Sequence, residues 1–131
     1  MNNMIRSGAI LGALGVVLGA FGAHALREIL SDKGLALWET AVRYHFYHAL
    51  ALLVIGLLYD RVPSSRLRLA SGLFVVGFLL FCGSLYALSF REVAAINLSW
   101  LGPITPLGGV CFILAWLLLA FNPKGDRQSQ N

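Results

Sequence analysis

Residues 7–26 read SGAILGALGVVLGAFGAHAL, and this run contains no Asp, Glu, Lys or Arg. A helix that crosses the hydrocarbon core of a bilayer needs about 20 predominantly apolar residues, which is the length of the run. Further apolar runs occupy residues 44–59 and 69–90, and a fourth lies within residues 93–123, where we expect it to begin at Pro103. Because lipid offers backbone amides no hydrogen-bond partner, these runs predict membrane-spanning helices.

The composition agrees with a chain whose solvent is mostly lipid. Hydrophobic residues make up 58% of the 131 residues, charged residues make up 12%, and the mean hydropathy is +0.75. Soluble globular domains carry about 25% charged residues, and so small a chain cannot hide this much apolar surface from water. We therefore predict an all-α integral membrane four-helix bundle. It forms a single domain over residues 1–131, with approximate spans 7–26, 40–60, 68–90 and 103–121.

The basic residues lie in short polar segments between the apolar runs. Nucleic-acid-binding proteins instead gather Lys and Arg on one face, so we expect membrane lipid and no nucleic acid as a partner. Four spans place six of the ten basic residues on the side of both termini, namely Arg6, Arg61, Arg66, Arg68, Lys124 and Arg127. Since basic excess marks the cytoplasmic face, both termini are expected there.

Five glycines of the first run are spaced four, three, four and three residues apart, namely Gly8, Gly12, Gly15, Gly19 and Gly22. This spacing places them on one face of a helix. Small residues let helices approach closely in lipid, so the glycine stripe predicts a helix-packing surface. The stripe could bind a second copy, but we favour packing within its own bundle because three partner helices are already present.

Polar side chains in the outer half of the predicted bundle form a candidate site. His24 closes the first span, and Tyr44 and His48 share a face of the second helix, which Ser31 or Asp32 is expected to cap. Ionisable residues in membranes often carry function, so His24, Tyr44 and His48 could line a binding or conduction site for a proton, a metal ion or a small polar solute. Alternatively, they are interfacial side chains or hydrogen bond to neighbouring helices. A pair such as His45 and His48 is weak evidence for a metal, and we predict no metal site and no cofactor.

The fourth run opens with the sequence GPITP at residues 102–106. Proline is accepted in the first turn of a helix, so Pro103 and Pro106 predict a helix start, and a broken segment that lines a site is the alternative. Thr105 is the remaining member of the candidate polar site and is also suited to bonding at this helix start. The motifs of P-loop proteins and of serine hydrolases are absent, so we predict no catalytic residues and no enzymatic activity.

Four blocks of the sequence occur together in a known family. They are GAFGAHAL at residues 19–26, Tyr44 with His48, GSLYAL at residues 83–88, and GPITPLGG at residues 102–109 followed by Trp116. In these blocks the chain resembles the domain of unknown function 423 family of small multi-span bacterial membrane proteins. The family often has glutamine where this chain has His45. The resemblance implies a multi-pass protein of the bacterial inner membrane and implies no particular biochemical activity.

These observations predict a small membrane protein with a structural or accessory role, which packs as a homo-oligomer or with a larger membrane complex. The first alternative is the polar-solute site of His24, Tyr44 and His48. The second is a lipid or quinone site in a groove between helices, which Tyr86, Trp116 and the proline block could line. Little chain remains outside the four spans, so we expect the function to be exercised within the membrane.

Overall fold

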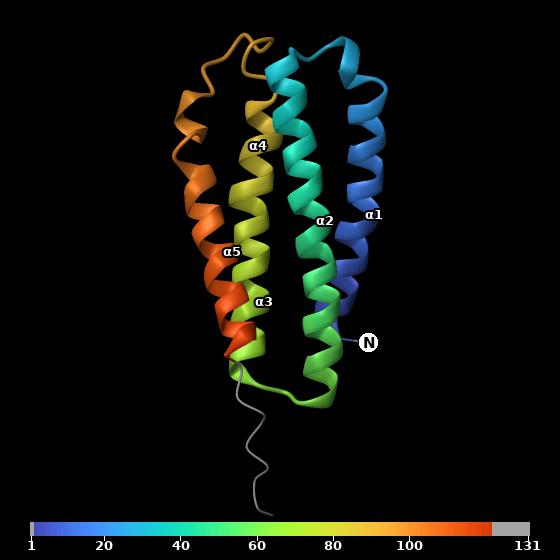
Figure 1. Cartoon of the computed structure of the whole chain (residues 1–131), viewed down its shortest axis with the longest axis vertical. Coiled ribbons are helices and arrows are strands. Elements are labelled where there is room, and N and C mark those ends of the chain that lie inside the picture. Colours follow the sequence, from blue (N-terminus) through green and yellow to red (C-terminus); the bar gives the residue numbers. More distant parts are fainter. Residues whose placement is uncertain (1, 122–131) are drawn as a thin grey trace, which may run out of the picture.

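The computed structural model describes residues 2–121, which form a bundle of helical spans lying side by side (Figure 1). Its α-helices are α1 (Asn3–Ala23), α2 (Asp32–Arg61), α3 (Ser65–Gly77), α4 (Gly83–Leu88) and α5 (Ile104–Ala120). The π-helical segment η2 (Phe78–Cys82) joins α3 to α4 in one span. The 3-10 segment η1 (Leu26–Glu28) lies between α1 and α2, and the 3-10 segment η3 (Ser99–Leu101) begins the fourth span, which α5 completes. Residues 2–121 contain no strand, and four spans are long and apolar enough to cross a membrane, so the predicted fold class is confirmed.

Polar side chains fix where the first two helices begin. The Asn2 side chain accepts a hydrogen bond from the Ile5 N–H at 3.0 Å and donates to the Gly56 carbonyl and the Asp60 carboxylate, both at 2.7 Å. Asn2 therefore caps α1 and also ties it to the end of α2. The Ser31 hydroxyl accepts from the backbone N–H of Gly34 at 3.1 Å, so Ser31 caps α2.

The helices do not coincide with the predicted spans. The predicted span 40–60 lies inside α2, which begins at Asp32 directly after the Ser31 cap and is 30 residues long. Its length of about 45 Å exceeds a hydrocarbon core of about 30 Å, so part of α2 projects beyond the core. The first span ends at Ala23 instead of residue 26, because the backbone of His24 leaves the helical conformation with φ −119° and ψ −80°.

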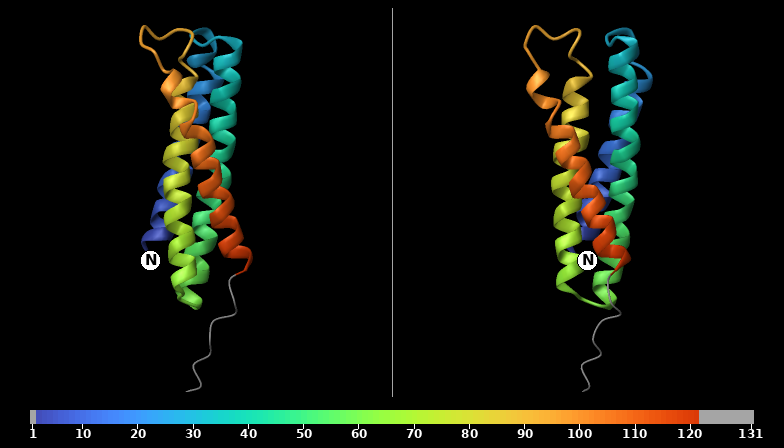
Figure 2. Two further views of the ribbon diagram at one scale, coloured as in Figure 1. Left: turned by 90° about the vertical axis from the view of Figure 1, so that its left-hand side faces the viewer. Right: turned by 60° about the vertical axis from the view of Figure 1, so that its left-hand side comes forward.

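The bundle consists of two helix pairs. α1 packs chiefly against α2, α5 packs chiefly against α3 and η2, and α2 joins the pairs through α3, η2 and α4 (Figure 2). The inner spans bury 44% and 39% of their most apolar windows, whereas α1 and the span of α5 bury 11% and 17%. The outer helices thus present most of their apolar surface to the surroundings, which suits a chain surrounded by lipid.

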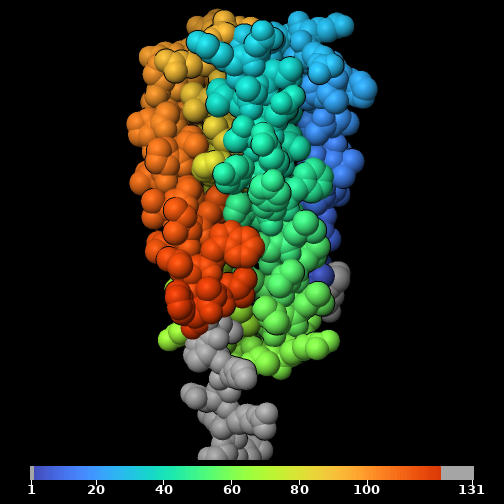
Figure 3. Space-filling view, viewed as in Figure 1, coloured from blue at the N-terminus to red at the C-terminus, as the bar shows by residue number. Residues whose placement is uncertain are grey.

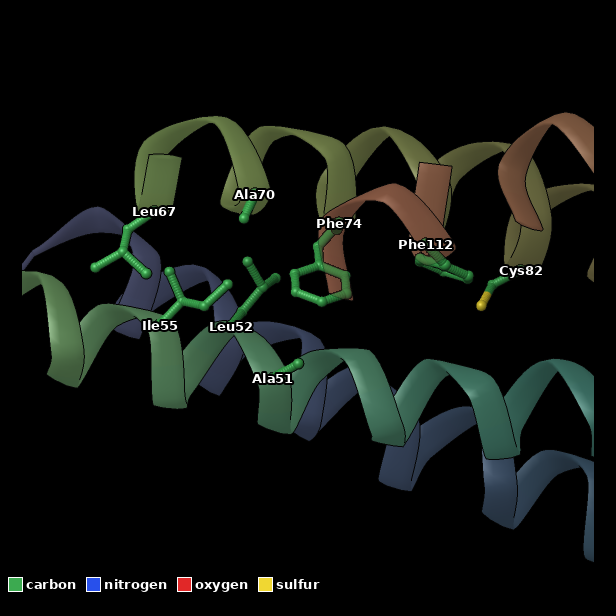
Figure 4. Close-up of a cluster of buried hydrophobic side chains, with 9 residues drawn as sticks. Ala51, Leu52, Ile55, Leu67, Ala70, Phe74, Cys82 and Phe112 are labelled. Carbon is green, nitrogen blue, oxygen red and sulfur yellow. The ribbon is translucent and has the colours of Figure 1, made fainter. Parts of the chain in front are cut away.

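The main core lies between α2, α3 and α5. Leu52 and Ile55 of α2 meet Leu67 and Phe74 of α3, and Phe112 enters this cluster from α5 (Figure 4). The first four of these side chains are at most 1% exposed. This packing holds the three helices in a fixed register around the polar residues described below.

The segment η2 lies where α5 approaches the third span most closely. Gly77 faces the ring of Phe112, and Gly108 faces the backbone of Phe81, so a Cβ at either position would clash with its neighbour. A π-helical turn contains one more residue than an α-helical turn, and such bulges are frequent at functional sites. Here the same segment supplies Phe78 and Phe81 to the surroundings of the two buried histidines.

Candidate functional site

His45 and His48 lie near the middle of the bundle. Thirteen residues of α2 precede His45 and thirteen follow His48. Eight residues of α5 precede Phe112 and eight follow it, and the Phe112 ring stacks on His48 with centroids 3.5 Å apart and planes 5° apart. Both histidines thus lie at the mid-length of α2, which begins at Asp32.

The ring of His48 is buried and has a hydrogen bond at each nitrogen. Its Nδ1 lies 2.6 Å from the Tyr44 carbonyl oxygen, and its Nε2 lies 3.3 Å from the Trp116 indole N–H. A carbonyl only accepts and an indole N–H only donates, so the proton is on Nδ1 and the lone pair is on Nε2. His48 is therefore a neutral ring that connects α2 to α5.

His45 faces the other side of α2 and connects three helices. Its Nε2 lies 2.6 Å from the Leu11 carbonyl of α1, and its Nδ1 lies 2.9 Å from the Tyr86 hydroxyl of α4. The His45 side chain has no exposed surface, and the ring packs edge-on against Phe78. The two histidines thus act as polar links between helices, which was one of the interpretations open for such residues.

A pocket of about 430 Å³ opens between α2, η2 and α5 beside His48. We call it the aromatic groove, and its main lining residues are Tyr44, Tyr47, His48, Phe81, Phe112 and Trp116. Figure 3 shows the seam between α2 (green-blue) and α5 (orange) on the face where these helices lie next to each other. The volume falls within the range of roughly 300–1,000 Å³ that is typical of small-molecule sites.

Two phenol groups of the aromatic groove lack hydrogen-bond partners within the described chain. The hydroxyls of Tyr44 and Tyr47 donate to and accept from no group of residues 2–121, and the side chains are 38% and 52% exposed. The Tyr44 ring lies 4.7 Å from Phe81 and stacks at 6.1 Å on His48. The aromatic groove therefore combines flat apolar walls with unused polar atoms.

The structure brings Tyr44 and His48 together but leaves His24 apart. His24 is exposed at the C-terminal end of α1, next to Gly22, which faces Trp38. Trp38 precedes His48 by ten residues on α2, which corresponds to about 15 Å along the helix. Among residues 2–121, no group of three or more His, Cys, Asp or Glu side chains is arranged to hold a metal ion.

Thr105 and the prolines lie at the start of α5. The Thr105 hydroxyl is 2.5 Å from the Ser84 hydroxyl, which donates to the Phe81 carbonyl at 3.0 Å, so Thr105 links α5 to the third span. Pro103 is the residue that precedes α5, and Pro106 lies in its first turn. Both prolines thus lie where α5 starts, directly after the 3-10 segment η3 and Gly102.

The glycine stripe packs largely inside the bundle. A Cβ at Gly8 would meet the Ala49 carbonyl and Leu53, one at Gly15 would meet the Phe46 ring, and one at Gly22 would meet Trp38. Gly12 has nothing within 4 Å, and Gly19 meets only Val42 at 3.5 Å. Each GxxxG pair thus has one glycine, Gly8 or Gly15, packed tightly against α2, and a second glycine at which a Cβ would cause no clash.

Sequence reasoning placed Trp116 in a groove with Tyr86 and the proline block, whereas the aromatic groove joins Trp116 to Tyr44 and His48. The spacing of residues along α2 does not show that Phe81 and Phe112, from other helices, complete the walls of the aromatic groove. His45 was recognised as a neighbour of the candidate residues, yet the different roles of His45 and Tyr47 depend on which helix lies across from each. A comparison of positions along α2 and α5 could have paired His48 with Phe112, since both lie near the middle of their helices.

Comparisons with known proteins agree on one family. The family model described as "Protein of unknown function (DUF423)" matches residues 18–109. The chain is 46% identical to the UPF0382 membrane protein YwdK of Bacillus subtilis (strain 168), over 91% of this chain and 94% of that protein. It is 44% identical to a UPF0382 membrane protein of Staphylococcus epidermidis (strain ATCC 12228 / FDA PCI 1200) over 91% and 93%, and 38% identical to one of Haemophilus influenzae (strain ATCC 51907 / DSM 11121 / KW20 / Rd) over 92% of each.

No solved structure matches the chain. The family match covers most of the blocks from which the resemblance was inferred, and the relatives align over nearly their whole lengths. The chain therefore belongs to the DUF423 family of membrane proteins, whose function is unknown.

Proposed function

We propose that this chain is a non-enzymatic, multi-pass protein of the bacterial inner membrane that binds a small amphipathic molecule in the aromatic groove. The observation that carries the proposal is the pair of unpartnered phenols, Tyr44 and Tyr47, in a mid-bundle pocket with aromatic walls. The ligand would carry a flat ring for these walls and oxygen atoms for the hydroxyls. It would enter sideways from the lipid, because the groove lies on the outer surface of the bundle.

The energetics of polar groups support this proposal. The transfer of a hydroxyl from water to an apolar medium without a hydrogen bond costs roughly 2–7 kcal/mol of free energy, depending on the reference state. Buried tyrosine hydroxyls therefore usually find a partner. In the aromatic groove, Tyr44 and Tyr47 lie close to the level of His48, halfway along α2. The proposal places this level among the lipid tails, which offer no hydrogen bond. A polar ring in the groove would supply those bonds.

The geometry gives less support to a proton, metal or polar-solute site. His24 lies far from Tyr44 and His48, and both nitrogens of His45 and of His48 already have partners. A cation at either ring would have to displace a protein hydrogen bond. The contacts of a ligand with the Tyr44 and Tyr47 hydroxyls displace no protein hydrogen bond.

An accessory role through packing with a second copy or a larger complex is the second candidate. The observation that favours it is the surface of α5, where only Gly108, Phe112 and Ala115 of 17 residues are buried. Lipid would cover this face of α5 as well as a protein partner would. Lipid would, however, leave the phenols of the aromatic groove without hydrogen bonds. The ligand proposal therefore accounts for more of the structure.

The test is to identify the molecules that copurify with the protein when it is extracted with surrounding lipid. Gly109 lines the aromatic groove, and a Cβ there would meet only the Phe81 ring, at 3.7–3.8 Å. Gly109→Leu should therefore fill the groove without a clash with backbone. We expect mass spectrometry to find a ring-bearing molecule with the wild type and much less of it with Gly109→Leu.

The matched control is Gly72→Leu, because Gly72 is an exposed glycine of α3 with nothing within 4 Å. It should retain the ligand at the wild-type level. An identical set of copurified molecules for wild type, Gly109→Leu and Gly72→Leu would contradict the proposal. Native masses from the same samples report on the second candidate, which predicts a defined oligomer or a stoichiometric partner.

A further inference from the structure

We infer that the ligand of the aromatic groove is a ring hydroxyl compound of the hydroquinone type, which His48 selects over its quinone and its methyl ethers. This inference rests on the proposed function and adds the chemistry of the group that is recognised. It depends on which nitrogen of His48 carries the proton, on what holds the ring in place and on which of its two hydrogen bonds can be exchanged.

The orientation of His48 is fixed by three contacts. The Nδ1–H donates to the Tyr44 carbonyl at 2.6 Å, within the same helix, so this nitrogen is permanently engaged. The Phe112 ring covers one face of the imidazole at 3.5 Å, and Phe74 lies 5.4 Å away. A flip of the ring would lose the Tyr44 bond and leave a buried donor unpaired. His48 therefore always presents the Nε2 lone pair at the wall of the groove.

The bond at Nε2 is the one that a ligand can exchange. Its donor, the Trp116 indole, lies 3.3 Å away, beyond the usual 2.7–3.2 Å of N–H hydrogen bonds. Trp116 is 45% exposed and also lines the aromatic groove, so the indole can move toward the lipid without leaving a buried cavity. A ligand hydroxyl could then insert between the two rings, where it accepts a hydrogen bond from the indole N–H and donates one to Nε2.

This acceptor distinguishes ring substituents. A hydroquinone hydroxyl donates to Nε2, whereas a quinone carbonyl or a methoxy oxygen would bring its lone pair against that of the histidine. The hydroxyls of Tyr44 and Tyr47 can donate or accept, so they pair with the second ring oxygen of any of these molecules. All three compounds therefore fit the walls, and only the hydroquinone satisfies His48.

The experiment compares a decyl-substituted benzohydroquinone, its quinone and its dimethyl ether, under anaerobic conditions, with the full-length protein in lipid nanodiscs. One additional hydrogen bond contributes about 1 kcal/mol, and 1.4 kcal/mol is a factor of ten in affinity. We expect the hydroquinone to bind about fivefold more tightly than the other two. The NMR signal of the Trp116 indole ¹⁵N–¹H group can be assigned because it is absent in Trp116→Phe. This signal should shift when the hydroquinone binds and not when the dimethyl ether binds.

His48→Phe removes the acceptor and keeps an aromatic ring against Phe112. We expect this variant to bind all three compounds with similar affinity, near that of the wild type for the dimethyl ether. Equal wild-type affinities would overturn the inference and leave the groove proposal intact. If no compound binds and Gly109→Leu leaves the copurified molecules unchanged, both are overturned. The wild-type comparison decides the inference even if His48→Phe does not fold.

Discussion

Tyr86 and Tyr47 show how the same residue type serves two purposes in this bundle. The Tyr86 hydroxyl is the only partner of His45 Nδ1 among residues 2–121, whereas the Tyr47 hydroxyl has no partner there. One phenol therefore contributes to folding, and the other is free to contact a ligand. The two tyrosines differ in role because their rings face different helices, and not because of their neighbours in the sequence.

Tyr86→Phe should destabilise the protein by about 1–3 kcal/mol, because it leaves the buried Nδ1 of His45 without its hydrogen bond. Tyr47→Phe should change stability by no more than about 0.5 kcal/mol, since it removes no bond within the protein. The free energy of unfolding in mixed detergent micelles, followed by circular dichroism, measures both. Equal losses of stability in the two variants would show that the His45–Tyr86 bond is not the stabilising contact.

Residue identities predicted part of this arrangement. Tyr44, His48 and Trp116 stand out in an apolar chain because polar side chains in a membrane are costly. Their partners could not be predicted, because His48 meets Phe112 and Trp116 across 64 and 68 positions of sequence. His45 was given less weight on account of the family pattern, yet it is the more deeply buried of the two histidines, at 0% against 4%.

At the scale of the elements, α1 is held by a close fit of glycines against bulky side chains of α2. A Cβ added at Gly15 would lie 3.0 Å from the Phe46 ring. A Cβ added at Gly12, one turn away in the same helix, would meet nothing within 4 Å. The Trp38 indole N–H also donates to the Leu18 carbonyl of α1 at 2.9 Å. This pairing explains why three of the five glycines of the stripe are buried.

Gly15→Leu should therefore separate α1 from α2 and lower stability by about 1–3 kcal/mol, as overpacking does in other cores. Gly12→Leu is the matched control, because it is the same substitution in the same glycine stripe and has no neighbour to displace. Thermal unfolding of the two variants and the wild type compares them. A larger loss for Gly12→Leu than for Gly15→Leu would indicate that the stripe packs against a second copy instead.

The elements themselves were largely predictable, and their details were not. Runs of apolar residues set the number of spans because each must cross a core of about 30 Å. Ser31 as a cap follows from its hydroxyl and its place before a helical pattern, and the predicted span 40–60 lies inside the longer α2. The π-helical segment η2 has no distinct sequence signal, because it arises where Gly108 of α5 meets the backbone of Phe81.

At the scale of the whole molecule, both ends of the described chain lie at the same end of the bundle (Figure 1). Asn2 bonds to Asp60 near the end of α2, and the Arg66 guanidinium donates to the Phe121 carbonyl at 2.8 Å. This end also carries Arg61 and Arg68. Lys124 and Arg127, which add to the predicted charge bias, lie outside the described residues.

We expect this end to face the cytoplasm, because basic residues near span ends are retained there. A single-cysteine tag appended to the C-terminus should react with a membrane-impermeant thiol reagent only after the cells are permeabilised. The same tag in the connection between η1 and α2 should react in intact spheroplasts. The opposite pattern of labelling would reverse the orientation while leaving the fold unchanged.

The most direct test of the central claim is an experimental structure of the protein in its native lipid, without detergent. We predict density for a ring-bearing molecule in the aromatic groove, with an oxygen within hydrogen-bond distance of the Tyr44 or Tyr47 hydroxyl and the tail extending along α5. A groove that is closed by a second copy, or that holds only featureless lipid tails while both phenols remain unpaired, would contradict the claim.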